Sequence, residues 1–409
     1  MTKALSYPKS RMRILLLENV HPVAVELLQQ QGYQVDVRKQ ALSEDELIAE
    51  LADVSLLGIR SKTQVSRRVL EQAPRLLAIG AFCIGTNQID LQAATELGIA
   101  VFNAPFSNTR SVVELALAEM ILLMRGIPDK NRMLHAGQWD KSAAGSHEVR
   151  GKTLGLIGYG SIGTQLSVLA EAMGMRVLFF DIAEKLALGN AVQCRSMAEV
   201  LANADIVSLH VDGRASNTNL IGAEQLQTMR KGALLINLSR GHVVDIEALR
   251  DAVETGQLGG CAVDVFPYEP ASNDEPFESP LRGLRNTLLT PHVGGSTAEA
   301  QENIGRFVPG KLSDFVDTGA TQNAVNFPEI ILPTLADAHR VLHIHRNVPG
   351  ILARINSILA ERGVNIVGQY LKTNDTIGYV ITDINADYDE GVLAQLRALE
   401  HTLRVRVLY

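Results

Sequence analysis

The chain has 409 residues, of which 46% are hydrophobic and 20% are charged, and its formal net charge is −7. This length is too great for one hydrophobic core, so two or three domains are expected. The acidic balance excludes a general attraction to nucleic acid. The most apolar segment, residues 112–124, is too short and too charged to span a bilayer. The three cysteines, Cys83, Cys194 and Cys261, are widely spaced in apolar contexts, which predicts buried thiols in a reducing cytoplasm and no metal site.

Residues 11–107 alternate short apolar strands with helical segments. The strands are expected at residues 13–17, 34–37, 56–59, 76–79 and 100–102, with helices near 22–31, 44–52, 65–73 and 90–97. This alternation predicts a parallel sheet with helices on both faces, whose ligands bind beyond the carboxyl ends of the strands. The third strand is followed there by Arg60, Ser61 and Lys62. Two interpretations stay open: the two cations hold an anionic substrate, or they are a solvated surface pair.

A long helix is predicted over residues 109–125, with Thr109 as its capping residue. Its apolar positions go nearly all the way round, which indicates burial inside the core, between domains or between subunits. The following stretch, residues 126–150, is predicted to be loosely structured and contains Trp139, the only tryptophan.

The strand at residues 154–157 runs into the pattern G-x-G-x-x-G, formed by Gly158, Gly160 and Gly163, and a helix follows. Such glycines permit a tight turn, a close approach to a pyrophosphate, and close packing of helix on strand. The next strand ends in Asp181, whose carboxylate can accept hydrogen bonds from both adenosine ribose hydroxyls. Because this carboxylate also repels a 2′-phosphate, the sequence predicts NAD and not NADP.

Further strands at residues 175–181, 205–211, 233–239, 260–266 and 287–290 complete a six-stranded dinucleotide-binding unit. Three of them are followed by Arg240, Glu269 and His292, which the topology brings to one rim beside the nicotinamide. His292 can take the hydroxyl proton of a 2-hydroxy acid, Glu269 can orient and charge-stabilise the imidazole, and Arg240 can grip a carboxylate. Each has a purely structural alternative, as an ion-pair partner, a neighbour of a helix cap or a solvated loop acid.

Residues 297–318 are predicted to form a helix that returns to the first domain, and residues 319–337 a linker. The remaining elements, with strands at 339–345, 364–372, 376–384 and 404–409 and helices at 349–361 and 389–399, have the order βαββαβ of a small ferredoxin-like domain. The domain boundaries expected are 1–107 with 297–330 for substrate binding, 108–296 for NAD binding, and 331–409 for the last domain.

Six segments resemble the D-isomer-specific 2-hydroxyacid dehydrogenase family, in its bacterial branch with a C-terminal ACT regulatory domain: FCIGTNQID (82–90), FNAPFSNTRSVVEL (102–115), IGYGSIGTQL (157–166), INLSRGHVVD (236–245), AVDVFPYEP (262–270) and LLTPHVGGSTAEAQENIG (288–305). The resemblance covers residues 8–409. It implies an α/β fold with two doubly wound parallel-sheet domains, a flavodoxin-like substrate domain and a Rossmann NAD domain, plus the ACT domain.

The resemblance implies NAD-dependent oxidation of 3-phospho-D-glycerate to 3-phosphohydroxypyruvate, the first step of L-serine synthesis. It also implies inhibition by L-serine, a homotetramer, and reduction of 2-oxoglutarate as a further activity. A dehydrogenase for another 2-hydroxy acid is the first alternative, and a non-catalytic NAD-sensing protein the second.

The family's catalytic positions fall on Arg240, Glu269 and His292. The residues expected to contact NAD are Gly158, Gly160, Ser161, Ile162, Gly163, Asp181, Leu238, Ser239, Arg240, Asp264, His292, Val293, Gly294 and Gly295. The resemblance assigns the substrate to Arg60, Ser61, Asn108, Lys141 and Arg240, and L-serine to His345, Asn347 and Asn365. Residues 336–338 replace a glycine pair of close relatives, which makes them a doubtful hinge for transmitting inhibition.

Overall fold

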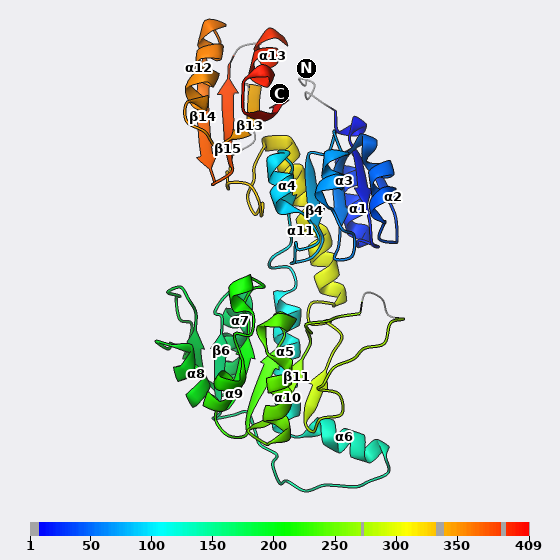
Figure 1. Cartoon of the computed structure of the whole chain (residues 1–409), viewed down its shortest axis with the longest axis vertical. Helices are drawn as coiled ribbons and strands as arrows, with labels where there is room; N and C mark the ends of the chain where they lie inside the picture. Colours follow the sequence, from blue (N-terminus) through cyan, green and yellow to red (C-terminus); the bar gives the residue numbers. More distant parts are fainter. Residues whose placement is uncertain (1–7, 271–273, 333–338, 386–389, 409) are drawn as a thin grey trace. The chain divides into compact units, whose positions relative to one another are not determined.

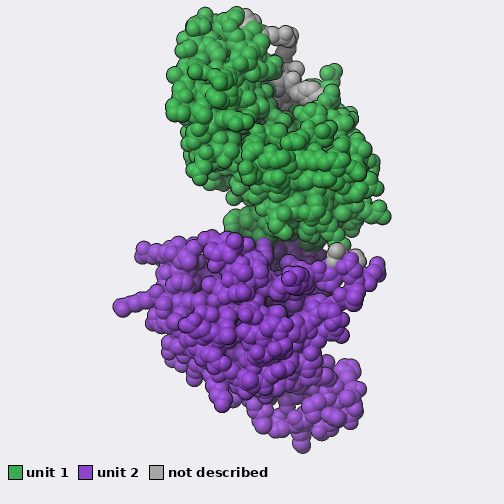
Figure 2. Space-filling model, in the orientation of Figure 1, with its two compact units in different colours: residues 1–107, 301–409 green, residues 108–300 purple. Residues whose placement is uncertain are grey.

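The computed structural model describes residues 8–270, 274–332, 339–385 and 390–408. The chain divides into two compact units, residues 1–107 with 301–409 and residues 108–300 (Figure 2). The doubtful hinge at residues 336–338 lies outside the described residues. Over the part of the chain that is described, no helix combines the length and hydrophobicity that a bilayer crossing requires.

The first unit begins with a five-stranded parallel sheet of order β2-β1-β3-β4-β5. Its strands are β1 (Arg13–Leu16), β2 (Gln34–Val37), β3 (Val54–Ile59), β4 (Ala78–Ala81) and β5 (Ala100–Phe102). This is the flavodoxin-like order, so the prediction for the first domain is confirmed. The carboxyl end of β3 carries residues 60–63, a loop to which the substrate residues Arg60 and Ser61 belong.

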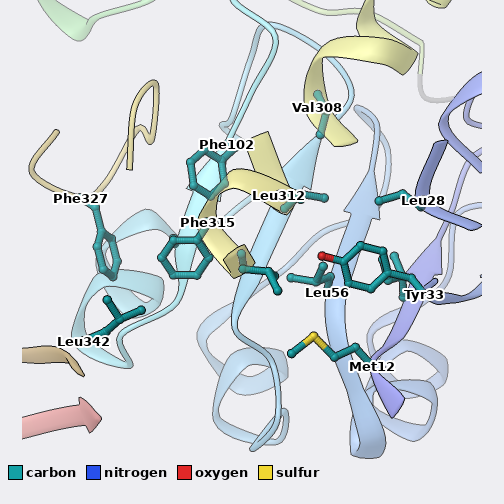
Figure 3. Close-up of a cluster of buried hydrophobic side chains, with 14 of the residues drawn as sticks. Met12, Leu28, Tyr33, Leu56, Phe102, Val308, Leu312, Phe315, Phe327 and Leu342 are labelled. Carbon is teal, nitrogen blue, oxygen red and sulfur yellow. The ribbon is translucent and has the colours of Figure 1, made fainter. Parts of the chain in front are cut away.

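Alternate residues along each strand of this sheet point to opposite faces and enter two separate cores. One core receives α1 (Pro22–Gln30) and α11 (Ala298–Thr318), and the other receives α2 (Glu44–Glu50), α3 (Arg67–Glu71) and α4 (Leu91–Glu96). Figure 3 shows the first core, where the rings of Phe102 and Phe315 lie 5.8 Å apart. Apolar side chains on successive turns of α11 therefore hold this helix on the sheet.

The last part of the first unit has the predicted βαββαβ order (Figure 1). Its elements are β13 (His339–Arg346), α12 (Ile351–Glu361), β14 (Ile366–Thr373), β15 (Ile377–Ile384), α13 (Glu390–Ala398) and β16 (Thr402–Leu408). The antiparallel sheet has the order β14-β15-β13-β16. One face packs against α12 and α13, while Leu342 (Figure 3) and Tyr379 on the other face join the core around α11.

The second unit is built on a seven-stranded parallel sheet of order β12-β11-β10-β9-β6-β7-β8. Its strands are β6 (Thr153–Ile157), β7 (Arg176–Phe180), β8 (Val192–Gln193), β9 (Ile206–Leu209), β10 (Ala233–Asn237), β11 (Leu258–Val263) and β12 (Thr287–Leu289). The order is that of a Rossmann domain with one further strand, so the predicted fold is confirmed, although β8 makes seven strands where six were predicted.

Helices cover both faces of the second sheet. The helices α5 (Thr109–Met124) and α7 (Ser161–Ala172) pack on one face, and α8 (Met197–Asn203), α9 (Ala223–Thr228) and α10 (Ile246–Glu254) pack on the other. Short 3₁₀ turns occur in both units: η1 (Lys9–Arg11) and η2 (Leu51–Asp53) in the first, and η3 (Ala215–Asn217) and η4 (Gly241–Val243) in the second.

Two local predictions in the second unit were wrong. The loosely structured stretch contains a helix, α6 (Ile127–His135), which begins at the left-handed residue Gly126 and has a proline in its first turn. The N-cap of α5 is Asn108 and not Thr109, and the Asn108 side chain makes no capping hydrogen bond. Helix α5 is buried along one side against α7 and the sheet, which accounts for its apolar character.

Candidate active site

The glycine turn after β6 has a geometry that only glycine fits at two of its three glycine positions. Gly158 has a φ of +92°, and a Cβ at this position would lie 2.4 Å from the carbonyl oxygen of His210. A Cβ on Gly163 would lie 2.4 Å from the carbonyl oxygen of Gly158, so helix and turn are in close contact. Gly160, the N-cap of α7, faces open space instead, with nothing within 4 Å of a Cβ position. A phosphate can thus approach the N–H groups of the helix end at Ser161 and Ile162, which fits a dinucleotide.

Asp181 stands one strand away from this turn, where the adenosine ribose is expected. Its Oδ2 accepts the backbone N–H of Tyr159 at 2.8 Å, and its Oδ1 accepts that of Ala183 at 2.9 Å. These two bonds orient the carboxylate, and each oxygen keeps a further acceptor direction. The residues present therefore fit the ribose hydroxyls of NAD.

Arg240 lies three residues after the end of β10, and the residues between them, Leu238 and Ser239, are buried. The Asn237 side chain shapes this turn: its Oδ1 accepts the N–H of Ser239 at 3.1 Å and its hydroxyl at 2.7 Å, and its Nδ2 donates to the Arg240 carbonyl at 3.1 Å. Sequence reasoning missed Asn237, although a polar residue closing an apolar strand was a usable signal. Next in the chain, a Cβ on Gly241 would lie 2.0 Å from the backbone of Phe266, so only glycine allows this contact.

His292 and Glu269 form a direct pair, with Nδ1 of the imidazole 2.9 Å from Oε2 of the carboxylate. Glu269 Oε1 also accepts the backbone N–H of Phe266 at 3.0 Å, so both its oxygens are engaged. The hydrogen bond to Glu269 raises the pKa of His292, against the opposing effects of burial and of Arg240. Burial acts to raise the pKa of Glu269, but the bonds from His292 and Phe266 outweigh it, and that pKa is lowered.

Asp264, at the end of β11, holds the backbone around His292. Its Oδ1 accepts the Thr290 hydroxyl at 2.6 Å and the N–H of Val293 at 2.8 Å, and its Oδ2 accepts the N–H of Gly294 at 2.8 Å. Its backbone carbonyl accepts the N–H of His292 at 2.8 Å. His292 has a φ of +54°, a left-handed conformation that costs a non-glycine residue about 1–2 kcal/mol. The four bonds keep His292 in this unfavourable conformation, which aims its ring at Glu269.

The second unit therefore brings Arg240, Glu269 and His292 to the carboxyl ends of its strands, together with the glycine turn and Asp264. The charge of Arg240 acts on both partners of the pair, since it lowers the pKa values of His292 and Glu269. A base with a charged partner, a neighbouring guanidinium and a dinucleotide turn can remove a proton and a hydride from a bound hydroxy acid. Over the described residues, no cluster of three or more His, Cys, Asp and Glu side chains could hold a metal ion.

The predicted substrate residues lie in several places. Asn108, at the start of α5, contacts the catalytic loop: a Cβ on Gly295 would lie 2.0 Å from its Nδ2, and its buried Oδ1 makes no hydrogen bond to described residues. Arg60 and Ser61 belong to the other unit.

Lys141 lines a pocket of about 280 Å³ with Arg125, beyond the far end of α5. The 16 residues of α5 span about 24 Å, so the structure does not bring Lys141 to His292 within this chain.

Two of the predicted effector residues, His345 and Asn347, lie at the turn between β13 and α12, whereas Asn365 precedes β14 at the opposite end of the sheet. His345 is buried, its Nδ1 lies 2.7 Å from the Arg346 carbonyl oxygen, and its Nε2 makes no hydrogen bond to described residues. Asn347 is exposed and does not cap α12: its Nδ2 donates to the Asn374 carbonyl at 2.8 Å. Asn365 is exposed just before β14. Burial lowers the pKa of His345, so its ring is neutral at pH 7.

Comparisons with known proteins agree with this geometry. Residues 117–294 match the NAD binding domain of D-isomer specific 2-hydroxyacid dehydrogenases, and residues 341–404 match the AHAS small subunit-like ACT domain. A D-3-phosphoglycerate dehydrogenase of Haemophilus influenzae is 52% identical over 410 residues, which is 100% of each chain. The Escherichia coli protein of that name is 52% identical over 407 residues, which is 99% of each chain.

Among solved structures, the D-lactate dehydrogenase of Aquifex aeolicus, complexed with NAD and lactic acid, matches with a TM-score of 0.66 and 25% identity, over 77% of this chain and 100% of that one. The predicted fold class, the dehydrogenase activity on a small molecule and the cofactor NAD are thereby confirmed. Because relatives 52% identical are matched along their whole length, the chain belongs to the D-isomer specific 2-hydroxyacid dehydrogenase family, in its D-3-phosphoglycerate dehydrogenase branch.

Proposed function

We propose that this enzyme oxidises 3-phospho-D-glycerate to 3-phosphohydroxypyruvate, the first step of L-serine synthesis. The observation that carries the proposal is the 52% identity, over the full length of both chains, to relatives named D-3-phosphoglycerate dehydrogenase. The matching D-lactate dehydrogenase structure, at 25% identity, covers only 77% of this chain. The full-length similarity thus favours a phosphoglycerate substrate over other 2-hydroxy acids.

In the proposed reaction, His292 takes the proton of the substrate hydroxyl on Nε2, because Nδ1 faces Glu269. Glu269 stabilises the imidazolium that forms and keeps the ring oriented. Arg240 binds the substrate carboxylate with paired N–H groups and polarises the reacting oxygen. NAD, when bound, accepts the hydride that leaves the substrate carbon. In the reverse direction His292 returns the proton, and one residue serves as base and as acid.

The NAD contacts proposed here come from residues that follow the strands β6, β7, β10, β11 and β12. The glycine turn and the first residues of α7 take the pyrophosphate, and Asp181 takes the ribose. Leu238, Ser239 and the loop from His292 to Gly295 lie at the strand ends expected to flank the nicotinamide. We propose contact with NAD by Asp264 as well, in addition to its hydrogen bonds within the loop.

The substrate phosphate is proposed to bind Arg60 and Ser61, and its carboxylate end Asn108 together with Arg240. Arg60 is half-exposed and Ser61 exposed at a strand end, which is where ligands of such sheets bind. Lys141 can contribute only from a second copy of the chain, since it lies beyond the far end of α5. A homotetramer is therefore part of the proposal. Exposed apolar side chains near Lys141, with Trp139 79% and Leu134 57% exposed, support burial of this region by another subunit.

We propose L-serine as the effector of the ACT domain and the cytoplasm as the location of the enzyme. The unpartnered Nε2 of the neutral His345 can accept a hydrogen bond, and the exposed amides of Asn347 and Asn365 can donate or accept one. The three cysteines form no disulfide with one another, which suits a reducing compartment. His345→Ala or Asn365→Ala is expected to abolish inhibition by serine and to leave uninhibited turnover unchanged.

The decisive experiment is NADH-dependent turnover of 3-phosphohydroxypyruvate and of unphosphorylated hydroxypyruvate, each with and without L-serine. The phosphorylated substrate is expected to have the higher kcat/KM, and serine to inhibit. Equal kcat/KM for both substrates would contradict the phosphate-specific assignment. His292→Ala should lower kcat by about 100-fold or more, while His147→Ala, at an exposed loop position, should not change it.

A further inference from the structure

The loop formed by residues 60–63 is anchored through its backbone by a buried glutamate. Glu18, two residues after the end of β1, is only 7% exposed. Its Oε2 accepts the backbone N–H of Lys62 at 2.9 Å, and its Oε1 accepts that of Thr63 at 2.8 Å. Each carboxylate oxygen thus holds one peptide group of the loop, and 44 or 45 residues of sequence separate Glu18 from these partners.

A second buried side chain holds the same loop through a backbone carbonyl, whereas Glu18 holds it through backbone N–H groups. Gln88 is 4% exposed, and its Nε2 donates to the carbonyl of Arg60 at 2.5 Å. The Cys83 thiol approaches that carbonyl oxygen at 3.5 Å. The peptide groups at residues 60, 62 and 63 are therefore fixed by side chains, while the side chains of Arg60 and Ser61 remain half-exposed and exposed.

Two features make Glu18 energetically unfavourable at this position: its buried carboxylate and its left-handed backbone conformation. Burying a carboxylate removes it from water, at a cost that hydrogen bonds must offset. Glu18 and Asn19 also have φ values of +62° and +53°, left-handed conformations that non-glycine residues seldom adopt. Unfavourable conformations and buried charges of this kind gather where a chain is held for a function. The function within reach of Glu18 is the loop that it holds.

We propose that Glu18 and Gln88 are positioning residues for the substrate phosphate, a role that rests on the proposed function. They fix the backbone of residues 60–63, so that Arg60 and Ser61 are already in place when the anion arrives and little ordering remains on binding. The charge of Glu18 is taken up by two amide dipoles.

The proposal predicts an effect on substrate binding and not on the cofactor. Glu18, Gln88 and the loop all belong to the first unit, whereas the glycine turn, Asp181 and His292 belong to the second. Loosening the loop should raise KM for the phosphorylated substrate and leave the Kd for NAD unchanged. A general loss of folding would change both.

The test compares Glu18→Gln with the wild-type enzyme in its full-length form. The amide offers one oxygen for two N–H groups, so KM for 3-phosphohydroxypyruvate should rise about tenfold, with kcat within about twofold and the same Kd for NAD. Hydrogen exchange at the Lys62 and Thr63 amides should become faster. Glu46→Gln is the matched control, because Glu46 also accepts a backbone N–H, that of Ser43 at 2.8 Å, at the start of α2.

Gln88→Met is a second test of the same loop. It removes the N–H donor to the Arg60 carbonyl, keeps the length of the side chain and changes no charge. It should raise the same KM, and it decides the question if Glu18→Gln does not fold. An unchanged KM and unchanged exchange in a folded variant would overturn the proposal, as would an equal rise in KM and in the Kd for NAD. If the wild-type enzyme does not reduce 3-phosphohydroxypyruvate, the proposed function fails, and the exchange of the two amides still decides whether Glu18 holds the loop.

Discussion

Replacing Glu269 by glutamine is expected to move the pH dependence of the two reaction directions in a defined way. The hydrogen bond from Glu269 to Nδ1 raises the pKa of His292. Glutamine keeps the size of the side chain and an oxygen for the N–H of Phe266, but it lacks the charge. The pKa of His292 should therefore fall, because burial and Arg240 lower it, and of the two carboxylates that raise it Asp264 remains while Glu269 is lost.

The size of this change follows from the geometry. An opposite charge at hydrogen-bond distance shifts a pKa by about 1 to 3. The side chains of His292 and Glu269 are 52% and 36% exposed, so solvent screens the pair and the low end of that range applies. We expect a fall of about one pH unit, which corresponds to about 1.4 kcal/mol between the two protonation states.

The lower pKa should weaken reduction at high pH and favour oxidation at low pH. Reduction needs the protonated imidazole, so its alkaline limb should move about one pH unit lower, and kcat/KM well above the pKa should drop about tenfold. Oxidation needs the neutral imidazole, so its acid limb should move lower as well, and the variant should keep a larger share of its activity at low pH.

The assay is kcat/KM from pH 5.5 to 10 in both directions, since this quantity reports the free enzyme. Glu278→Gln is the control, because Glu278 is an 81% exposed partner of Arg282 and should leave both limbs in place. An alkaline limb of reduction that stays where it is, or moves to higher pH, would refute the electrostatic role of Glu269. Equal losses at every pH would assign Glu269 an orienting role only.

Three further predictions follow from single positions. Asp181→Ala should narrow the preference for NAD over NADP about tenfold in steady-state kinetics with both cofactors, because charged hydrogen bonds contribute about 1.5–3 kcal/mol; an unchanged preference would contradict the assignment. Gly310→Ala should raise the melting temperature, since its Cβ would meet nothing within 4 Å on α11 and alanine gains about 1 kcal/mol in a helix. Burial, with Asp264 nearby, raises the pKa of Glu119 from 4.5 to about 8, so the wild type should lose stability as pH rises from 4.5 to 8. Glu119→Gln lacks this slope, and its melting temperature relative to wild type should increase over that range; a constant difference would argue against a neutral Glu119.

The sheets and the rim of the second unit could be predicted because few rules determine them. Apolar runs of strand length, the glycine turn and the rule that ligands lie beyond strand ends were enough to bring Arg240, Glu269 and His292 together. The 2.9 Å contact of Glu269 with His292 agrees with that expectation. Their catalytic roles stay a prediction until the variants are measured.

Other features depend on information that a single sequence does not display. Strand β8 has only two residues, too few for any alternation of apolar and polar positions. Helix α6 is polar, and no residue of it is buried, so its pattern is weak. Asn108 and Thr109 are adjacent capping residues, and only the backbone angles decide between them. The bonds of Glu18 and Asn237 join side chains to distant or irregular backbone, which no periodicity reveals.

Asp264 shows why a strand end can serve the chemistry without touching the reacting atoms. Its carboxylate accepts three hydrogen bonds from residues 290–294, and its carbonyl accepts a fourth from His292, whose φ is +54°. Strain of this kind persists only where the surroundings over-determine the conformation. A second ionised carboxylate near Asp264 would repel it. Glu119 avoids this, because burial raises its pKa to about 8 and keeps it protonated at neutral pH. The Asp264 carboxylate therefore holds the loop without repulsion from Glu119, and the loop in turn aims the imidazole at Glu269.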